Sequence, residues 1–367
     1  MTTRYRKFNN TIDKYPDLEL LDISSNDYKT ILARDCKYGV RSLSNKSFEG
    51  LNYTLGFELE TIKGSIPEGE EYDLNCKTVH DGSLRGDDGS DPLGAEYVTG
   101  ILTGDSGMMQ LQKICTVLSA HCAINHKCGV HVHVGNIKFT NESLLMMYYL
   151  ALQLESEIFE LMPASRRENS YCRKLKDLRL NFDSLLETKS KLSRDIIVDE
   201  LFEQFFKYVS HGHDINAGCN KNTNHPLGTK CGYNKETQRY SWLNFVHCVF
   251  ATRGKADYKT LEFRNHSATL NFKKIYYWTK ICIAFVNFVE NHSESILKRV
   301  HYDKKGNSFP INLETIINAA YPKTADTLIE YVQKRKVLFN TTEGESTDYS
   351  TDRKDSKNLK IKEITCV

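Results

Sequence analysis

The segment GVHVHVG, which begins at Gly129, alternates apolar and polar residues and constrains its local structure strongly. Side chains of a β-strand point alternately to opposite faces of a sheet. The valines therefore share one face, and His131 and His133 share the other. Two exposed histidines on a strand are common, so this segment alone does not establish a site.

Three further segments repeat the alternation: TLGFELETI, KTLEFRNH and the shorter GAEYVTG. Their apolar positions again fall on one face. The opposite face holds Glu58 and Glu60 in the first segment, Glu262 and Arg264 in the second, and Glu96 in the third. If the four segments belong to one sheet, its polar face collects several carboxylates, two imidazoles and an arginine.

Such a face has a definite chemistry. Carboxylates that crowd together repel one another and raise each other's pKa, so a cation is needed to neutralise them. Carboxylate oxygens suit Mg²⁺ or Mn²⁺, and a guanidinium beside such ions suits a polyphosphate. His131 and His133 stand about 7 Å apart along a regular strand. We therefore expect them to serve different functions rather than to reach one small ion.

Whole-chain properties narrow the class of protein. The 367 residues can bury a large core, and 40% hydrophobic with 26% charged residues is typical of a soluble globular protein. The net charge of +2 gives no overall basic field, so nucleic acid is not an expected partner. No apolar run could span a bilayer, and the first residues lack a signal-peptide core. The 11 cysteines follow no framework spacing, which predicts reduced thiols and a cytoplasmic protein.

Composition and periodicity divide the chain into parts. We expect an N-terminal extension over 1–50, a catalytic domain over 51–292 with a variable loop near 211–238, and a C-terminal helical segment with a charged tail over 293–367. Gly, Pro and acidic residues predict a loop over 64–76. Apolar spacing predicts helices near 106–124, 140–163, 195–210, 271–292 and 312–338. Strands combined with helices in this way predict an α+β fold.

Two further segments have competing interpretations. The loop from His211 to Cys231 holds histidines and cysteines that could ligate zinc, but their spacing matches no standard zinc pattern. A plain loop over the mouth of the site is the simpler interpretation. The stretch RRENSYCRKLKDLR, which begins at Arg166, is typical of a solvated helix face. Contact with an acidic or nucleic-acid partner is the alternative.

The ordered set GFELE, HDGSL, EYVTG, GVHVHV, RYSWLNF and LEFRNHSATLN, followed by a helix that bears a tryptophan, resembles the amidoligase family. That family belongs to the carboxylate–amine ligase superfamily, which includes glutamine synthetase and the glutamate–cysteine ligases. The resemblance covers roughly residues 53–290. It implies a glutamine synthetase-like fold, with a curved, mostly antiparallel sheet backed by helices and an active site on the concave polar face.

The resemblance also implies roles for single residues. The metal ligands would be Glu58, Glu60, Glu96, His131 and Glu262. The residues for catalysis and for binding nucleotide phosphate would be His133, Arg239 and Arg264. The further contacts to nucleotide or substrate would be Asp81, Ser83 and Asn244. The sequence GxxxxGK[ST] of a P-loop is absent, so ATP would be held by the sheet and the ions.

The activity that the resemblance implies is ATP-dependent joining of a carboxylate to an amine through an acyl phosphate, with two or more Mg²⁺ or Mn²⁺ ions. The amine would come from an amino acid, a peptide or a protein. The alternatives are a guanidino-kinase-like phosphotransferase and a non-catalytic module that binds nucleotide or metal. We expect Glu58→Ala to abolish ATP turnover. Because the change relieves repulsion, thermal stability without metal should hold or rise.

Overall fold

The structure is a computed structural model that describes residues 51–62, 64–66, 74–81, 84, 94–175, 198–199, 201–203, 205–206, 209, 238–252, 259–303 and 311–340. Several expectations fall outside these residues. They concern the N-terminal extension, Ser83, the loop with its zinc alternative, and the tail after Asn340.

One antiparallel sheet organises the described part of the chain. Its strands are β1 (Thr54–Thr61), β2 (Cys76–His80), β3 (Ala95–Thr99), β4 (Leu102–Thr103), β5 (Gly129–Gly135), β6 (Leu243–Asn244) and β7 (Leu261–Ser267). They lie in the order β2-β3-β1-β5-β7-β6, and β4 pairs with β1 outside this path. Every pair is antiparallel. The predicted α+β class and antiparallel sheet are confirmed.

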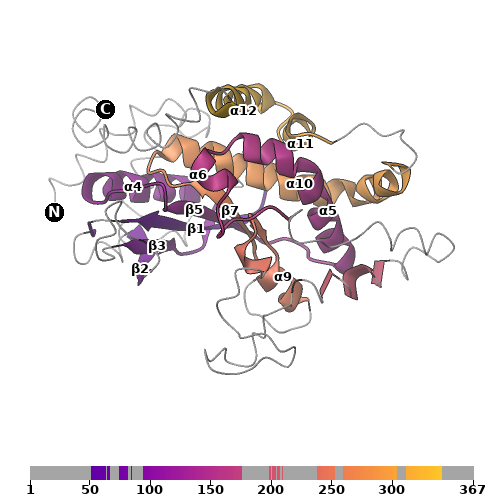
Figure 1. Cartoon of the computed structure of the whole chain (residues 1–367), viewed down its shortest axis with the longest axis horizontal. Helices are drawn as coiled ribbons and strands as arrows, with labels where there is room; N and C mark the ends of the chain where they lie inside the picture. Colours follow the sequence, from indigo (N-terminus) through magenta and orange to yellow (C-terminus); the bar gives the residue numbers. More distant parts are fainter. Residues whose placement is uncertain are drawn as a thin grey trace.

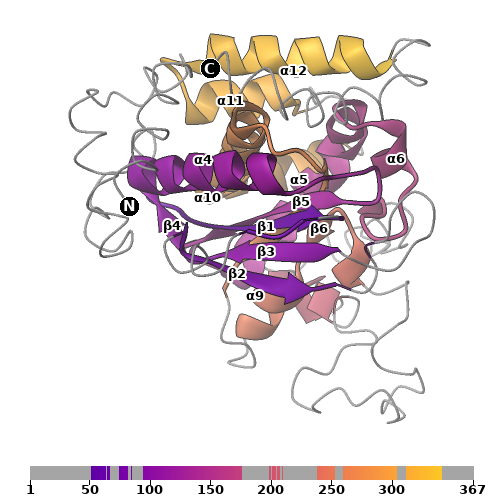
Figure 2. The same cartoon turned by 90° about the vertical axis from the view of Figure 1, so that its left-hand side faces the viewer.

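Helices cover one face of this sheet in two successive layers (Figure 1). The helices are α4 (Gly104–His121), α5 (Asn141–Glu160), α6 (Ala164–Arg167), α9 (Val246–Ala251), α10 (Phe272–Asp303), α11 (Leu313–Ala320) and α12 (Ala325–Asn340). Figure 2 shows α4 and α10 next to the sheet, with α11 and α12 stacked above them. The short helix α9 lies on the opposite side of the sheet from α10 (Figures 1 and 2). Apart from α9, the layers of helices leave the other face of the sheet uncovered, and the polar side chains of the central strands lie on it.

The alternating strands bury the faces that the sequence predicts. Leu55, Phe57 and Leu59 of β1 are buried, and the valines of β5 are buried with them. Phe263 of β7 packs edge-on against Trp278 and against a further aromatic ring of α10. This apolar layer fixes which way each strand faces, because a one-residue slip would send every side chain to the other face.

The predicted helices form with altered limits. Thr140 caps α5 through a capping box with Ser143, which satisfies backbone groups at the helix start. The helix predicted over 271–292 extends to Asp303, across a kink at His292. The described residues between 198 and 209 are helical, as expected. In contrast, the predicted loop over 64–76 overlaps the start of β2 at Cys76, a strand that the sequence pattern did not indicate.

Within the described residues the cysteines carry free thiols, and all except Cys76 are buried. Their burial agrees with the expectation that most serve as small core residues. None of the described helices combines the length and the apolar character that crossing a membrane requires.

Candidate active site

The polar face of the central strands gathers the acidic and imidazole groups into one row. Glu58 of β1 lies opposite His131 of β5, and Glu60 lies opposite Glu96 of β3. On the other side of β5, His133 lies opposite Glu262 of β7. Directly paired residues bring their Cβ atoms within about 5 Å. The fold therefore brings together side chains that are separated by more than half of the described sequence.

Glu58 is the centre of this row. His131 donates through Nδ1 to Glu58 Oε2 at 2.6 Å, and His133 donates through Nε2 to Glu58 Oε1 at 3.0 Å. Burial acts to raise the pKa of Glu58, but the two imidazole hydrogen bonds outweigh it and hold that pKa well below its usual range. The pKa of His133 is raised: burial opposes this, while the charge of Glu262 and the bond to Glu58 cause it.

These contacts correct the expectation about metal-free stability. Glu58 is stabilised by two imidazoles, so its removal should cost stability rather than relieve repulsion. Glu96 is instead the carboxyl whose charged form is disfavoured in the metal-free protein. Burial, followed by the nearby charges of Glu58 and Glu60, raises the pKa of Glu96 to about 9. Glu60 is held by a hydrogen bond at 2.6 Å from the backbone N–H of Gly129.

Glu262 and Arg264 form a buried ion pair at the β7 side of the row. Burial acts to raise the pKa of Glu262, and the charges of Arg264 and then His133 lower it below its usual range. Asn244 of β6 donates through Nδ2 to Glu262 Oε2 at 2.6 Å, and its Oδ1 accepts from the N–H of Val246 at 3.0 Å. The bond from Val246 holds the Asn244 amide in place, and its Nδ2 then orients Glu262.

Two overlapping groups of side chains could hold a metal ion. One is Glu58, Glu96 and His131, and the other is Glu58, His133 and Glu262. Within each group the ligand atoms lie within 4.8 Å of one another. Carboxylate oxygens with one imidazole nitrogen fit Mg²⁺ or Mn²⁺. Burial is the largest cause of the raised pKa of Glu96, and the nearby carboxylates Glu58 and Glu60 raise it further, so a cation at this group would relieve repulsion.

The row forms one wall of a pocket of about 700 Å³. This volume is within the range of pockets that hold nucleotides and drug-sized ligands. The pocket is lined by Glu58, Glu60, His80, Asp81, Glu96, His126, Lys127, His131, His133, Ser165, Arg166, Glu168, Asn169, Ser170, Tyr171, Arg239, Tyr240, Asn244, His247, Glu262 and Arg264. All of the site residues that the sequence predicted are thus in its lining, except Ser83, which is outside the described part.

Sequence reasoning missed several lining residues. Tyr171 lies in a turn, Tyr240 ends a short 3-10 helix over Gln238–Tyr240, and His247 lies in the short helix α9, so no long periodic pattern marks the direction in which they face. The rings of Tyr171 and Tyr240 pack edge to face, with centroids 5.6 Å apart. Thr260, one residue before β7, lies 3.3 Å from His133 Nδ1 through its hydroxyl. Tyr240 belongs to the RYSWLNF motif, which is the signal that could have indicated it.

The interpretation of RRENSYCRKLKDLR as a solvated helix face is wrong for its first two residues. Arg166 is only 2% exposed and hydrogen-bonds to backbone carbonyls of β7. Arg167 donates to the backbone of Phe339 and to Asn340 at the end of α12. Both guanidinium groups thus donate to backbone carbonyls of the protein rather than to solvent alone.

We predict that Glu96→Gln stabilises the metal-free protein. Its folded pKa of about 9 exceeds the ordinary value of 4.5, so ionisation favours the unfolded chain over this interval. The gain over wild type should be absent below about pH 4.5 and should grow toward pH 9. Near neutral pH the gain in the free energy of unfolding should exceed about 1 kcal/mol, which is roughly the energy that corresponds to a shift of one pKa unit. Chemical denaturation in chelator measures the gain, and a loss of stability above neutral pH would contradict the crowding.

The fold and the row together define an α+β protein with a candidate divalent-ion site on the polar, pocket-lining face of an antiparallel sheet. A family model described as "putative amidoligase enzyme" matches residues 69–286, which is more than half of the chain, and the chain belongs to this family. The match begins after β1, so Glu58 and Glu60 join the site through the sheet. Neither the curated proteins nor the solved structures contain a match.

Proposed function

We propose that this amidoligase-family chain is an ATP-dependent carboxylate–amine ligase that works through an acyl phosphate. The observation that carries the proposal is the row of four glutamates, two histidines and Arg264 on one wall of a nucleotide-sized pocket. Family membership supports the ligase class. The substrates would be a carboxylate and an amine from an amino acid, a peptide or a protein.

In this proposal the metal ligands are Glu58, Glu60, Glu96, His131 and Glu262. When bound, Mg²⁺ or Mn²⁺ ions would neutralise the charge of the nucleotide phosphates. Arg264 and Arg239 would stabilise the phosphoryl group during its transfer. Glu262 and the backbone carbonyl of Tyr171 already orient the Arg264 guanidinium, the carbonyl at 3.4 Å from Nε. Arg264 is thus held in place before a nucleotide arrives, which reduces the cost of reorganisation.

The proposed reaction has two steps. A carboxylate oxygen attacks the γ-phosphorus of ATP, the bond to the bridging oxygen breaks, and ADP leaves. The amine nitrogen then attacks the carbonyl carbon of the acyl phosphate. A C–N bond forms, the bond between carbon and the phosphate oxygen breaks, and inorganic phosphate and one proton are released. The products are an amide, ADP and phosphate.

A pooled-substrate assay tests this proposal. The protein is incubated with ATP, Mg²⁺ and pools of carboxylates and amines, and ADP and new masses are measured. The proposal expects ADP together with a mass that corresponds to a condensed carboxylate and amine. A phosphorylated product without amide would assign a phosphotransferase instead. Absence of nucleotide binding would assign a non-catalytic module.

We predict that ATP and divalent ions bind with positive linkage. The acidic row should repel bare ATP, so the nucleotide needs cations to bridge it to the carboxylates. Calorimetric titration with ATP should give much tighter binding in Mg²⁺ or Mn²⁺ than in excess chelator. By reciprocity, ATP should tighten metal binding by the same factor. Equal affinity in the two conditions would remove the metal-site assignment.

The two histidines are predicted to have separable effects. His131→Ala should raise the metal concentration needed for half-maximal turnover, because His131 belongs to the group with Glu58 and Glu96. His133→Ala should lower turnover at saturating metal with little change in that requirement, if His133 contacts phosphate. Metal titrations of both variants measure this. Because His133 also groups with Glu58 and Glu262, superimposable titration curves would make both histidines metal ligands and contradict the separation.

A further inference from the structure

The pairing of β5 with β7 contains an irregularity beside the candidate site. Val130 pairs with His266 and Val132 pairs with Phe263, so Arg264 and its neighbour Asn265 together stand opposite the single residue His131. An extra residue of this kind is a β-bulge, which bends the strand, re-aims side chains and leaves backbone groups outside the ladder. The bulge falls at the residue whose guanidinium faces Glu262.

Arg166 binds the backbone of this bulge. Its Nη2 donates to the carbonyl of Arg264 at 2.6 Å, and its Nε donates to the carbonyl of Asn265 at 3.4 Å. The Arg166 side chain is buried, and the planar guanidinium can serve two neighbouring acceptors at once. A buried carbonyl without a hydrogen-bond donor destabilises the folded protein. The conformation of the bulge therefore depends on Arg166.

The guanidinium of Arg166 also contacts the start of β5. A Cβ added to Gly129 would lie 2.8 Å from Arg166 Nη2, so the glycine leaves room for that group. The N–H of Gly129 in turn donates to Glu60. Arg166 therefore lies between the strand end that holds Glu60 and the bulge that carries Arg264.

The chain after α6 closes a ring of contacts around Arg264. The Arg166 carbonyl accepts a contact of 3.5 Å from the thiol of Cys172, and Arg173 then pairs in parallel with Ser241. The N–H of Arg264 donates at 2.7 Å to the carbonyl of Trp242, the residue after Ser241. Both backbone polar groups of Arg264 are thus bound, one through Arg166 and one through Trp242.

We infer that Arg166 is a positioning residue that fixes the β7 bulge and thereby aims Arg264 and Glu60 at the pocket. The inference rests on the proposed function for the metal and nucleotide binding that Arg166 would support. Arg166 lines the pocket, but its guanidinium donates to backbone carbonyls of the bulge. Lysine cannot replace it fully, because a single ammonium does not match two carbonyls in the plane of a guanidinium.

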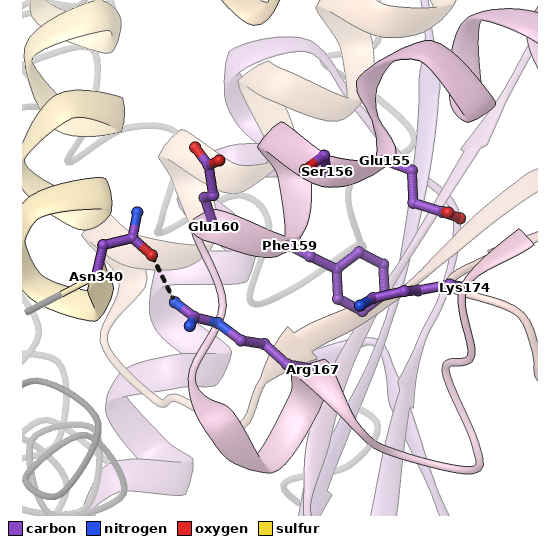
Figure 3. A pocket seen from close by; sticks show the side chains of 7 residues that line it. All are labelled: Glu155, Ser156, Phe159, Glu160, Arg167, Lys174 and Asn340. Carbon is purple, nitrogen blue, oxygen red and sulfur yellow. Dashed lines mark hydrogen bonds between the residues drawn. The ribbon is translucent and has the colours of Figure 1, made fainter. Parts of the chain in front are cut away.

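The test compares Arg166→Gln and Arg166→Lys with the neighbouring control Arg167→Gln. Arg167 points away from the site toward Asn340, 3.1 Å away, beside a separate pocket of about 250 Å³ (Figure 3). We expect both Arg166 variants to weaken Mn²⁺ and Mg²⁺–ATP binding about 10- to 100-fold, as for residues that orient metal ligands. The Arg167 variant should bind like wild type, even if its melting temperature falls.

Gly129→Ala provides a second route if the Arg166 variants do not fold. The new methyl group should displace the far end of the Arg166 side chain while leaving the Gly129 N–H in place. We expect faster hydrogen exchange at the Arg264 amide and weaker Mn²⁺ binding. In an Arg264→Lys background, Arg166→Gln should cost little further nucleotide affinity, because both changes act on one group.

Arg166 variants that bind Mn²⁺ and nucleotide as the Arg167 control does would overturn the inference, as would fully additive losses in the double variant. Wild-type Mn²⁺ binding and amide exchange in Gly129→Ala would overturn it as well. These readouts do not require turnover. A wild-type protein that forms no amide product would therefore refute the ligase proposal. Metal binding and hydrogen exchange at the Arg264 backbone N–H would still test the positioning role of Arg166.

Discussion

Replacing Glu58 by glutamine is expected to abolish ATP-dependent turnover and to weaken metal binding at both candidate groups. Glu58 belongs to both of them, through Oε1 toward His133 and Oε2 toward His131. Changing a residue that only orients metal ligands lowers metal affinity or activity by up to about 100-fold. A shared ligand should therefore cost more than that. Metal titration of turnover, together with Mn²⁺ binding, measures the loss.

The same change should reduce stability without metal. Removing one partner of a buried ion pair costs about 3–5 kcal/mol, and less is expected here because the Glu58 side chain is 23% exposed. The lowered pKa of Glu58 means that its contribution is present at neutral pH and is lost as pH falls below the usual carboxyl range. Glu58→Gln should therefore lose most near neutral pH and least in strong acid.

Glu157→Gln is a matched control for Glu58→Gln. Glu157 has a similar side-chain exposure of 22% and also forms an ion pair, with Lys336 of α12. It accepts a hydrogen bond at 2.7 Å from the N–H of Leu313, far from the sheet. This variant should lose stability but keep metal binding and turnover. If Glu58→Gln bound metal as wild type does, or if both variants weakened metal binding equally, the assignment of Glu58 would be wrong.

Arg264→Lys is expected to lower turnover by about 10²–10³-fold, as when one preorganised donor to a transition-state charge is removed. Lysine keeps the charge that Glu262 needs, so the fold should survive. It loses the fork that serves Glu262 and the Tyr171 carbonyl together. The loss should appear in kcat at saturating Mg²⁺–ATP, because in the proposed mechanism Arg264 meets a phosphoryl charge that develops in the transition state.

Arg335→Lys is the control for this substitution. Arg335 is a buried arginine of α12 whose Nε donates to the carbonyl of Leu161 at 3.0 Å. The change should affect stability and leave kcat unchanged. A wild-type kcat for Arg264→Lys would show that Arg264 has no role in phosphoryl transfer. Equal kcat losses in the two variants would indicate a general effect of replacing a buried arginine.

The facing of the long strands was predictable because it depends on a local period. Side chains two residues apart share a face in any strand, so the positions of Phe57 and Glu58 relative to each other follow from the sequence. The identity of the strands that lie beside a given strand in the sheet does not follow from this local period. β7 lies between β5 and β6, although about a third of the chain separates β5 from β7 in the sequence. Strand order depends on long-range packing that no short motif encodes.

The pKa values of individual carboxyl groups could not be predicted from the sequence either. Glu58 and Glu96 look alike in an alternating pattern, yet the pKa of one is lowered and that of the other is raised. The difference arises from cross-strand register, which gives Glu58 both imidazoles and places Glu96 beside two other carboxylates. Arg166 escaped for another reason, because a run of charges in a short helix usually marks a solvated face.

In the proposed function, the face that carries the candidate metal ligands activates a carboxylate as an acyl phosphate and transfers it to an amine. Oxygen-isotope transfer tests this most directly. Pooled carboxylates labelled with ¹⁸O are incubated with amines, ATP, Mg²⁺ and the protein, and the released phosphate and the amide are analysed by mass. The account predicts that each amide formed is accompanied by a phosphate that carries one ¹⁸O from the carboxylate. Unlabelled phosphate accompanying the amide, or ADP release without any amide, would contradict it.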